Sequence, residues 1–231
     1  MSQKEKLDLS KLTKKDFPLI KELSYEQEDM VIKLFKYQRV IVDSVAGSGK
    51  TCVLTQAMKA LLDKGIIDTI YYVVFPVQEN ALGFLPGDLS KKIQEYGKPF
   101  REALIKAGVN PHEIDIEKMC NEEIPGKYKV VSHTFLRGRT VEGVGVLIDE
   151  AQNGTVFELK KVFTRITDDC YLGIAGHNGQ IDIAKETSGF SRYIHYFKTG
   201  KESGIFPDID FAELTHDFRG KFSRFSDQIP D

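Results

Sequence analysis

The sequence has few cysteines and no long hydrophobic run. Its three cysteines are far apart and form no Cys-x-x-Cys pair, which argues against a disulfide framework and a zinc knuckle. The histidines show neither a His-Glu-x-x-His motif nor paired spacing with cysteine, so no protein-bound zinc is expected. No apolar run approaches the roughly 20 residues that cross a bilayer, and the polar first residues lack a signal-peptide core. We therefore expect a soluble, cytoplasmic protein without a membrane partner.

The sequence also lacks an excess of charge of one sign. Its formal net charge is −2, so any nucleic-acid partner would have to be held by a local stripe of Lys and Arg. With 41% hydrophobic and 29% charged residues in 231 positions, the composition suits one globular domain. We expect residues 1–20 to form a flexible or loosely docked arm and residues 21–231 to form a single domain.

Short β-branched or apolar segments alternate with helical patterns along the chain. Strands are expected at residues 39–43, 69–75, 128–132, 144–149, 170–175 and 211–215. Helices are expected at residues 25–37, 50–64, 89–107, 156–166 and 191–198. Because several strands are apolar throughout, this alternation predicts an α/β fold with a mostly parallel sheet covered by helices on both faces. Ligands of such sheets bind at the carboxyl ends of the strands.

The segment VAGSGKT stands at such a carboxyl end, between a predicted strand and a predicted helix. In a phosphate loop, glycines let backbone N–H groups surround an anion, a lysine reaches the terminal phosphates, and Ser or Thr binds magnesium. The residues expected to contact ATP here are Ala46, Gly47, Ser48, Gly49, Lys50, Thr51 and Cys52. Ser44 replaces the first glycine of the usual pattern, and Ala46-Gly47 would then make the tight turn.

Two neighbouring carboxylates, Asp149 and Glu150, follow an apolar strand further along the chain. A phosphate-loop ATPase keeps its second motif at such a place. Thr51 would hold Mg²⁺ together with Asp149, which would do so directly or through water, while Glu150 would orient the attacking water and accept its proton. The alternative is a solvated Asp-Glu helix start, which is common after strands of α/β proteins.

Longer segments point to one family. VAGSGKT, NALGFLPGDLSKKIQEYGKPFREAL, FLRGRT, VLIDEAQN, LKKVFTRI and GHNGQIDI follow one another between residues 23 and 197. In this order they resemble PhoH-like proteins, and GFLPGDL and the DEAQN that precedes TRI are specific because generic phosphate-loop proteins lack them. The resemblance implies a RecA-like ATPase domain similar to the first core of superfamily 1 helicases, often ring-forming and linked with RNA metabolism.

The resemblance also assigns roles by position. It places the phosphate loop at residues 47–51 and the second motif at Asp149 and Glu150, and it matches Gln180 to the glutamine that senses the γ-phosphate in related helicases. The chain departs from the family pattern in two places. Gly176-His177 stands where the family usually has Gly-Asp, and Phe75-Pro76 stands where it usually has Arg-Pro.

Two further residues have alternative interpretations. Gln27 stands where superfamily 1 helicases keep a glutamine that reads the adenine edge, but Ser24 and Gln27 also form the S-x-x-Q pattern of a capping box. Arg219 follows the last predicted strand and resembles the helicase arginine that lies against the γ-phosphate. There a guanidinium stabilises the negative charge on the oxygens of the phosphoryl group during its transfer. The alternative for Arg219 is a surface position on a C-terminal helix.

Basic and aromatic residues elsewhere are candidates for contact with a partner. Arg137, Arg139 and Arg165 could contact RNA phosphates or reach a neighbouring subunit's site, or they could be solvated charges of a turn and a helix end. Phe84 is a candidate platform for base stacking, with a buried loop anchor as the alternative.

The predicted function is Mg²⁺-dependent ATP hydrolysis coupled to nucleic acid, with single-stranded RNA preferred over DNA. Catalytic roles are expected for Lys50, Glu150, Gln180 and Arg219. Full helicases close their site between two such cores, whereas this length suits one, so a homo-oligomer, in the extreme a hexameric ring, is expected. The alternatives are a nucleotide-dependent switch with little turnover and a phosphate-loop small-molecule kinase, although no dense arginine-rich lid is visible.

Overall fold

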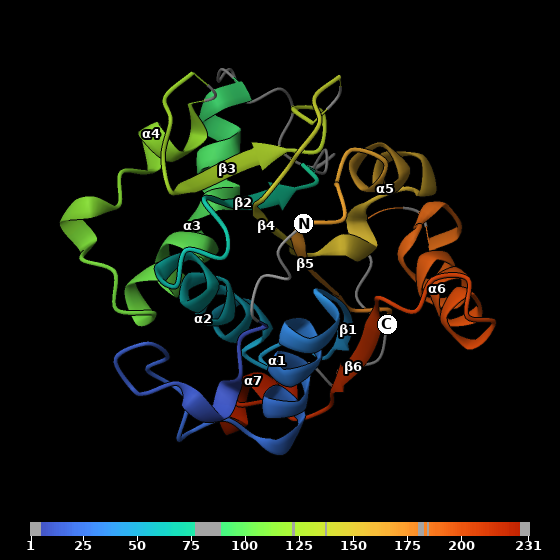
Figure 1. The fold of residues 1–231 in the computed structure, drawn as a ribbon, viewed down its shortest axis with the longest axis horizontal. Helices are drawn as coiled ribbons and strands as arrows, with labels where there is room; N and C mark the ends of the chain where they lie inside the picture. The colour runs from blue at the N-terminus through green and yellow to red at the C-terminus, as the bar shows by residue number, and fades with distance from the viewer. Residues whose placement is uncertain are drawn as a thin grey trace.

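The computed structural model describes residues 6–76, 89–121, 123–136, 138–179, 183 and 185–226 (Figure 1). Its strands are β1 Arg39–Ser44, β2 Ile70–Val74, β3 Tyr128–Ser132, β4 Gly145–Ile148, β5 Tyr171–Gly176 and β6 Asp210–Leu214. Its helices are α1 Tyr25–Tyr37, α2 Lys50–Asp63, α3 Leu89–Lys106, α4 Ile116–Cys120, α5 Val156–Phe163, α6 Phe190–Glu202 and α7 Lys221–Ser226. The predicted strands are confirmed to within about one residue, while the short helix α4 was not predicted and a C-terminal helix such as α7 was named only in the alternative for Arg219.

The strands form one sheet in the order β3-β2-β4-β5-β1-β6, and each neighbouring pair is parallel. The chain leaves β1 through α2 and returns three places away at β2, so β4 and β5 enter the sheet between them. This order brings the carboxyl ends of β1 and β4 to the same edge with only β5 between them. The predicted α/β fold with a parallel sheet is therefore confirmed.

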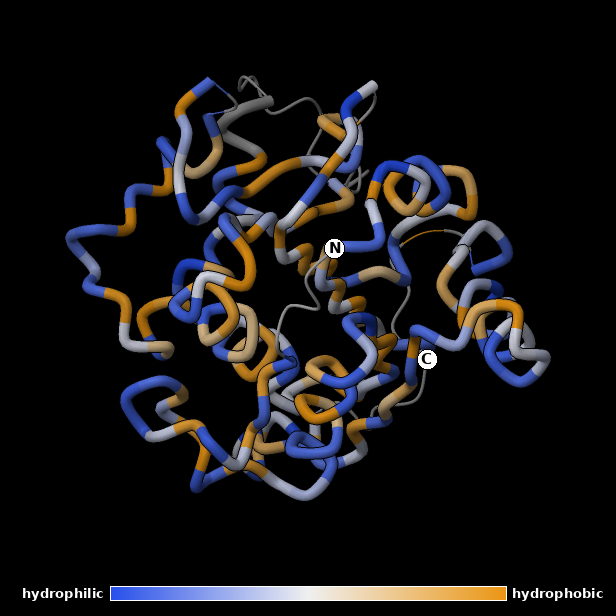
Figure 2. Tube along the Cα trace, in the orientation of Figure 1, coloured by the Kyte–Doolittle hydropathy of each residue, from blue (hydrophilic) through white to orange (hydrophobic). Residues whose placement is uncertain are grey.

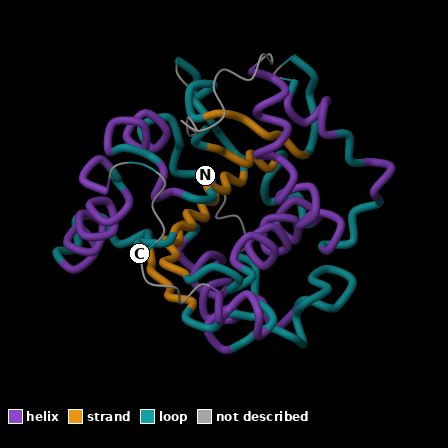
Figure 3. The backbone as a smooth tube through the Cα atoms, turned by 180° about the vertical axis from the view of Figure 1, so that it is seen from behind, coloured by secondary structure: helices purple, strands orange, loops and turns teal. Residues whose placement is uncertain are grey.

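Helices cover both faces of the sheet. Figure 3 shows the strands as one diagonal layer with groups of helices on either side. In Figure 1, α1, α2 and α3 lie on one side of the strands, and α5 and α6 lie on the other. Figure 2 shows hydrophobic residues along the central strands, whereas much of the surrounding loop surface is hydrophilic.

Each face has its own hydrophobic core because successive side chains of a strand point to opposite faces. On β1, Val40 and Val42 pack into the cluster with Leu54 of α2. Ile41, which lies between them in sequence, packs into the second cluster with Leu159 of α5. The alternation along β1 therefore fixes the strand between the two helical layers and holds the loop that follows it at the edge of the sheet.

The segment expected to be a flexible or loosely docked arm packs on the domain, which fits the docked alternative. Leu9, Leu12 and Phe17 are buried in the cluster that contains α1 and α2. The backbone N–H of Leu19 donates to Gln56 Oε1 of α2 at 3.0 Å. The sequence did not predict these contacts, because the segment is polar on average and its few apolar residues follow neither helical nor strand periodicity. Residues 1–5 lie outside the described residues, and one domain from residue 21 onward stays a prediction.

Within the described part of the chain, no helix combines the length and the apolar character of a membrane span.

Candidate functional site

The loop between β1 and α2 depends on two glycines in the left-handed region. Gly47 has φ 75° and Gly49 has φ 77°, a conformation that glycine adopts at little cost and that other residues rarely adopt. A Cβ atom on Gly47 would lie 2.2 Å from Asp217 Oδ1, so the loop is also packed closely against the segment after β6. Gly47 therefore makes the tight turn that the sequence assigned to Ala46-Gly47.

Ser44, which replaces the usual first glycine, has a structural role in the sheet. It is the last residue of β1, it is buried, and its hydroxyl donates to the carbonyl of Gly176 on β5 at 3.3 Å. The following residue, Val45, donates its backbone N–H to the carbonyl of Leu214 on β6 at 3.0 Å. The loop is thus anchored to both neighbours of β1, and the replacement of glycine leaves its turn intact.

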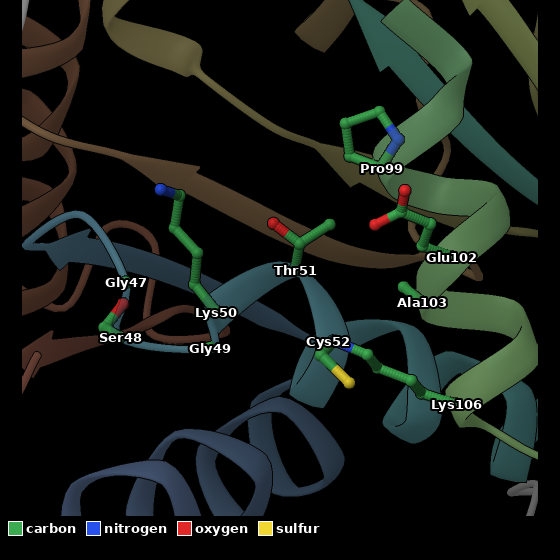
Figure 4. A pocket seen from close by; sticks show the side chains of 10 residues that line it. All are labelled: Gly47, Ser48, Gly49, Lys50, Thr51, Cys52, Pro99, Glu102, Ala103 and Lys106. Atoms are coloured by element: carbon green, nitrogen blue, oxygen red, sulfur yellow. The ribbon is translucent and has the colours of Figure 1, made fainter. Parts of the chain in front are cut away.

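A cavity of about 240 Å³ lies beside this loop (Figure 4). One wall is formed by residues 47–52, at the start of α2, where unpaired backbone N–H groups and the helix dipole favour an anion. The other wall belongs to α3 and consists of Pro99, Glu102, Ala103 and Lys106. The sequence predicted the first wall. The second was not predicted, because no local pattern shows that α3 packs beside α2.

Asp149 follows β4 and faces the start of α2. Its Oδ2 accepts a hydrogen bond from Thr51 Oγ1 at 2.6 Å and a second from the hydroxyl of Tyr72 at 2.9 Å. Its Oδ1 accepts from the backbone N–H of Glu150 at 3.0 Å. Burial raises the pKa of Asp149, and the nearby charge of Lys50 opposes that rise. Burial likewise raises the pKa of Tyr72 well above its ordinary value, so its hydroxyl stays a donor.

Glu150 is held in an unusual conformation between two partners. Its backbone is left-handed, with φ 51°, and such conformations of non-glycine residues concentrate at functional sites. Its Oε1 lies 3.2 Å from Lys50 Nζ, and its Oε2 accepts from Gln152 Nε2 at 2.6 Å. Gln152 is buried, and its Oε1 accepts from the backbone N–H of His177 at 3.0 Å. Gln152 thus connects the second motif to the end of β5.

The residues around the loop fit a nucleoside triphosphate with Mg²⁺. Ser48 Oγ is buried and has no hydrogen-bond partner among the described residues, which leaves a donor available for a phosphate oxygen. Thr51 and Asp149 offer the oxygen ligands that Mg²⁺ prefers. Among the described residues, no three His, Cys, Asp or Glu side chains are grouped around one metal position. A bound Mg²⁺ would therefore rely on phosphate oxygens as well, as is usual for this ion.

The structure forms the capping box that is one interpretation of Gln27, and it places the same side chain against the phosphate loop. The capping box is formed, because Ser24 N donates to Gln27 Oε1 at 3.0 Å and Gln27 N donates to Ser24 Oγ at 3.2 Å. At the same time, Gln27 Nε2 donates to the carbonyl of Ser48 in the loop at 2.8 Å. One side chain therefore caps α1 and contacts the phosphate loop. Contact with a base remains a proposal.

Arg219 lies against the phosphate loop, just before α7. A Cβ atom on Gly47 would lie 2.6 Å from Arg219 Cγ. The guanidinium pairs with Asp217, with 2.9 Å from Nε to Oδ2 and 2.8 Å from Nη2 to Oδ2. The structure thus places Arg219 beside the loop, while Asp217 holds its guanidinium.

The remaining candidates from the sequence lie in different places. Gln180, Phe84 and Arg137 lie outside the described residues. The Arg139 guanidinium lies over the ring of Phe135, 4.1 Å from its centroid. The Arg165 carbonyl accepts from the backbone N–H of Val141, ahead of β4. The backbone of Arg165 therefore lies near the start of β4, at the opposite end of that strand from Asp149.

The structure also shows the surroundings of Cys52, of His177 and of Phe75. Cys52 is half-buried in the cavity wall, and burial raises the pKa of its thiol. His177 Nδ1 accepts from the backbone N–H of Gly179 at 2.8 Å. The Phe75 ring stacks on the His133 ring, with centroids 5.2 Å apart. The two departures from the family pattern, at residues 75 and 177, are thus accommodated locally.

The chain is similar to proteins of one family. The profile of the family described as PhoH-like protein matches residues 19–215. Protein PhoH of Escherichia coli (strain K12) is 31% identical over 173 residues, covering 73% of this chain and 47% of that protein. A PhoH-like protein of Bacillus subtilis (strain 168) is 31% identical over 161 residues, covering 69% of this chain and 48% of that protein. The chain thus spans about half the length of the curated relatives it matches.

The fold also matches a solved structure. The Hef helicase domain of Pyrococcus furiosus has a TM-score of 0.50 at 13% identity, with 84% of this chain and 38% of that chain covered. At this identity the likeness concerns the fold, and it agrees with a phosphate-loop nucleoside triphosphatase core.

Proposed function

The chain belongs to the PhoH-like protein family, and we propose that it binds ATP with Mg²⁺ and hydrolyses it to act on nucleic acid. The observation that carries this proposal joins two motifs 98 positions apart: Thr51 Oγ1 lies 2.6 Å from Asp149 Oδ2. The neighbouring Lys50 Nζ lies 3.2 Å from Glu150 Oε1. A phosphate-binding motif and a carboxylate motif in such contact are the recurring parts of phosphate-loop ATPases.

Binding would use the cavity between the loop and α3. The backbone N–H groups of residues 46–52 would surround the phosphates, and Lys50 would contact the β- and γ-phosphates. The unpartnered hydroxyl of Ser48 supports this, because a phosphate oxygen is an acceptor of the kind it lacks. Gln27 would lie on the base side of the loop, where it already donates to Ser48.

Hydrolysis would depend on Glu150 as general base. Glu150 would orient a water molecule and accept its proton, and Gln152 would hold the carboxylate in place through Oε2. Thr51 and Asp149 would hold Mg²⁺, which when bound neutralises charge on the phosphates. For this to occur, Lys50 must leave Glu150 and turn to the phosphates.

Two further residues would complete the catalytic set. Arg219 would exchange its partner Asp217 for the γ-phosphate, where a guanidinium stabilises the charge of the transferring group. Gln180, assigned by resemblance, would sense the same phosphate.

The nucleic-acid partner and the assembly follow from the family resemblance. We propose single-stranded RNA in preference to DNA, and a homo-oligomer, in the extreme a hexameric ring, in which a neighbouring copy supplies an arginine to the site. Light scattering across a concentration series, combined with the ATPase rate, tests the assembly. A monomer at high concentration with the full rate would contradict it.

A nucleotide-dependent switch with little turnover is the second candidate function. The ion pair between Lys50 and Glu150 favours it, because both groups are engaged with each other and not with substrate. His177 stands where the family usually has Asp, and this departure also favours a switch with little turnover. The two functions differ in whether phosphate release exceeds one per chain.

A binding experiment tests the site directly. We expect Lys50→Ala to weaken binding of a fluorescent ATP analogue at least tenfold, since it removes a charge-assisted contact of about 1.5–3 kcal/mol. Lys59→Ala is the matched control on the same helix, where the lysine pairs with Asp63 at 2.5 Å. Equal binding by both variants and the wild type would contradict the proposed site.

A further inference from the structure

Tyr72 contributes a hydroxyl to the candidate site from an unexpected direction. It lies in the middle of β2, is buried, and donates to Asp149 Oδ2 at 2.9 Å. No phosphate-loop or carboxylate motif contains it, and the sequence around it is that of a core strand.

The hydroxyl completes the hydrogen bonding of one carboxylate oxygen. A carboxylate oxygen has about two lone-pair positions, and Asp149 Oδ2 already accepts from Thr51 and Tyr72. Asp149 Oδ1 accepts from the backbone N–H of Glu150. Asp149 is therefore fixed by three donors from three different segments: the start of α2, the middle of β2 and its own turn.

The ring of Tyr72 is fixed as firmly as its hydroxyl. It stacks on the ring of Phe100 from α3, with centroids 4.8 Å apart and planes 3° from parallel. Phe100 is fully buried, and its neighbour Pro99 lines the cavity. Because buried aromatic stacking restricts the ring, the position of the hydroxyl is set by the packing of α3 on the sheet.

We propose that Tyr72 is a positioning residue for the magnesium site. The Tyr72 hydroxyl holds the Asp149 carboxylate in one orientation. In that orientation, Asp149 Oδ2 accepts from the Thr51 hydroxyl and so fixes the oxygen that would bind Mg²⁺. The Thr51 oxygen can donate to Asp149 and still offer lone pairs to the cavity. Without the Tyr72 hydroxyl, Asp149 Oδ2 would keep only the hydrogen bond from Thr51, so one of its buried lone pairs would be unsatisfied and the carboxylate would have more than one available orientation. This inference rests on the proposed function, since it concerns the metal of that site.

The test separates metal binding from nucleotide binding. Affinity for a fluorescent ADP analogue is measured first with EDTA and then across a Mg²⁺ titration, so that the readout does not depend on turnover. Tyr72→Phe removes only the hydroxyl and keeps the ring that stacks on Phe100. We expect its affinity in EDTA to match the wild type, while the Mg²⁺ concentration at the midpoint rises about tenfold, as for loss of a hydrogen bond to a charged group.

Tyr71→Phe is the matched control. Tyr71 is the preceding residue of β2, it packs on the opposite face of the sheet, and its ring lies 6.3 Å from Phe135. This variant should leave both the EDTA affinity and the Mg²⁺ midpoint unchanged.

The outcomes distinguish this inference from the proposed function. If the wild type binds nucleotide with Mg²⁺ and Tyr72→Phe has the same Mg²⁺ midpoint, the role of Tyr72 is wrong while the site stands. If Tyr72→Phe lowers the EDTA affinity, the Mg²⁺ response and the melting temperature together, Tyr72 is only structural and the inference is overturned. If the wild type shows no Mg²⁺-dependent nucleotide binding, the proposed function fails and the inference fails with it.

Discussion

Gln152 Nε2 donates a hydrogen bond of 2.6 Å to Glu150 Oε2, while the other carboxylate oxygen, Oε1, lies 3.2 Å from Lys50 Nζ. The other end of the same amide accepts from the backbone N–H of His177 at 3.0 Å. Gln152 is 1% exposed, so neither bond is readily replaced by water. The orientation of the proposed general base is therefore coupled to the end of β5, where a γ-phosphate sensor is expected.

Replacement of Gln152 tests this coupling. Gln152→Met keeps the length of the side chain but removes both hydrogen bonds. We expect the rate of phosphate release to fall about tenfold or more, because a misplaced general base loses much of its contribution of about 10² to 10⁴. Binding of an ATP analogue should change by less than about threefold, since Gln152 does not line the cavity. A loss of binding equal to the loss of rate would show that Gln152 acts only on the fold.

Gly47 should tolerate no side chain. Gly47→Ala meets both an unfavourable φ and a contact of 2.2 Å between the added Cβ and Asp217 Oδ1. We expect it to abolish nucleotide binding and to lower the free energy of unfolding by more than about 1 kcal/mol. Gly65→Ala is the control, because Gly65 also has positive φ but would meet nothing within 4 Å. It should cost about 1 kcal/mol and leave nucleotide binding unchanged.

The two roles of Gln27 can be separated by substitution. Gln27→Glu preserves the acceptor of the capping box, for which Glu is equally suited, but it loses the donor to the carbonyl of Ser48. We expect weaker nucleotide binding with little change in melting temperature. Ser24→Ala should do the reverse, with a loss of about 1 kcal/mol in stability and unchanged binding. Identical profiles for the two variants, measured by thermal unfolding and by fluorescence, would argue against separate roles.

The stability of the link between α1 and β6 should depend on pH. The hydroxyl of Thr215 donates to Glu26 and lowers the pKa of that carboxyl. A carboxyl whose pKa is lower in the folded state stabilises the fold above its unfolded pKa, and this stabilisation is lost as the pH falls through the folded value. Thr215→Val should therefore be less stable than the wild type at neutral pH, and the difference should narrow in acid. Urea unfolding at neutral and at acid pH measures the difference in the free energy of unfolding between the two proteins. A difference that does not depend on pH would contradict the role given to Glu26.

Replacement of Phe17 tests whether the N-terminal segment packs on the domain. Its side chain is fully buried in the cluster with α1 and α2. We expect Phe17→Ala to lower the free energy of unfolding by about 3–5 kcal/mol, as for other buried aromatic residues. A loss below about 0.5 kcal/mol in denaturant unfolding is typical of a surface position and would restore the interpretation as a loosely attached arm.

The sequence predicted the positions of candidate residues where these residues are consecutive in the chain. The loop from Gly47 to Thr51 and the pair Asp149 and Glu150 were predicted because each lies at the end of a strand, where the motif itself carries the chemistry. The strands were predicted for a similar reason, since buried parallel strands are short apolar runs bounded by turns.

Features that depend on contacts between distant segments were not predicted. Tyr72 reads as a core residue of β2, and only the order of the sheet shows that β2 lies beside β4 and thus near Asp149. Gln152 belongs to a motif, yet its bond to His177 depends on β5 being the neighbour of β4. The packing of Leu9 depends on contacts with α1 and α2 that no local periodicity encodes.

The central claim is that this site hydrolyses ATP. Steady-state release of phosphate from ATP with Mg²⁺, with and without single-stranded RNA or DNA, tests it most directly when the wild type is compared with Glu150→Gln. We expect repeated turnover that nucleic acid stimulates, and a Glu150→Gln variant that still binds ATP but does not turn it over. ATP bound by the wild type with no more than one phosphate released per chain would contradict the account and leave the switch in its place.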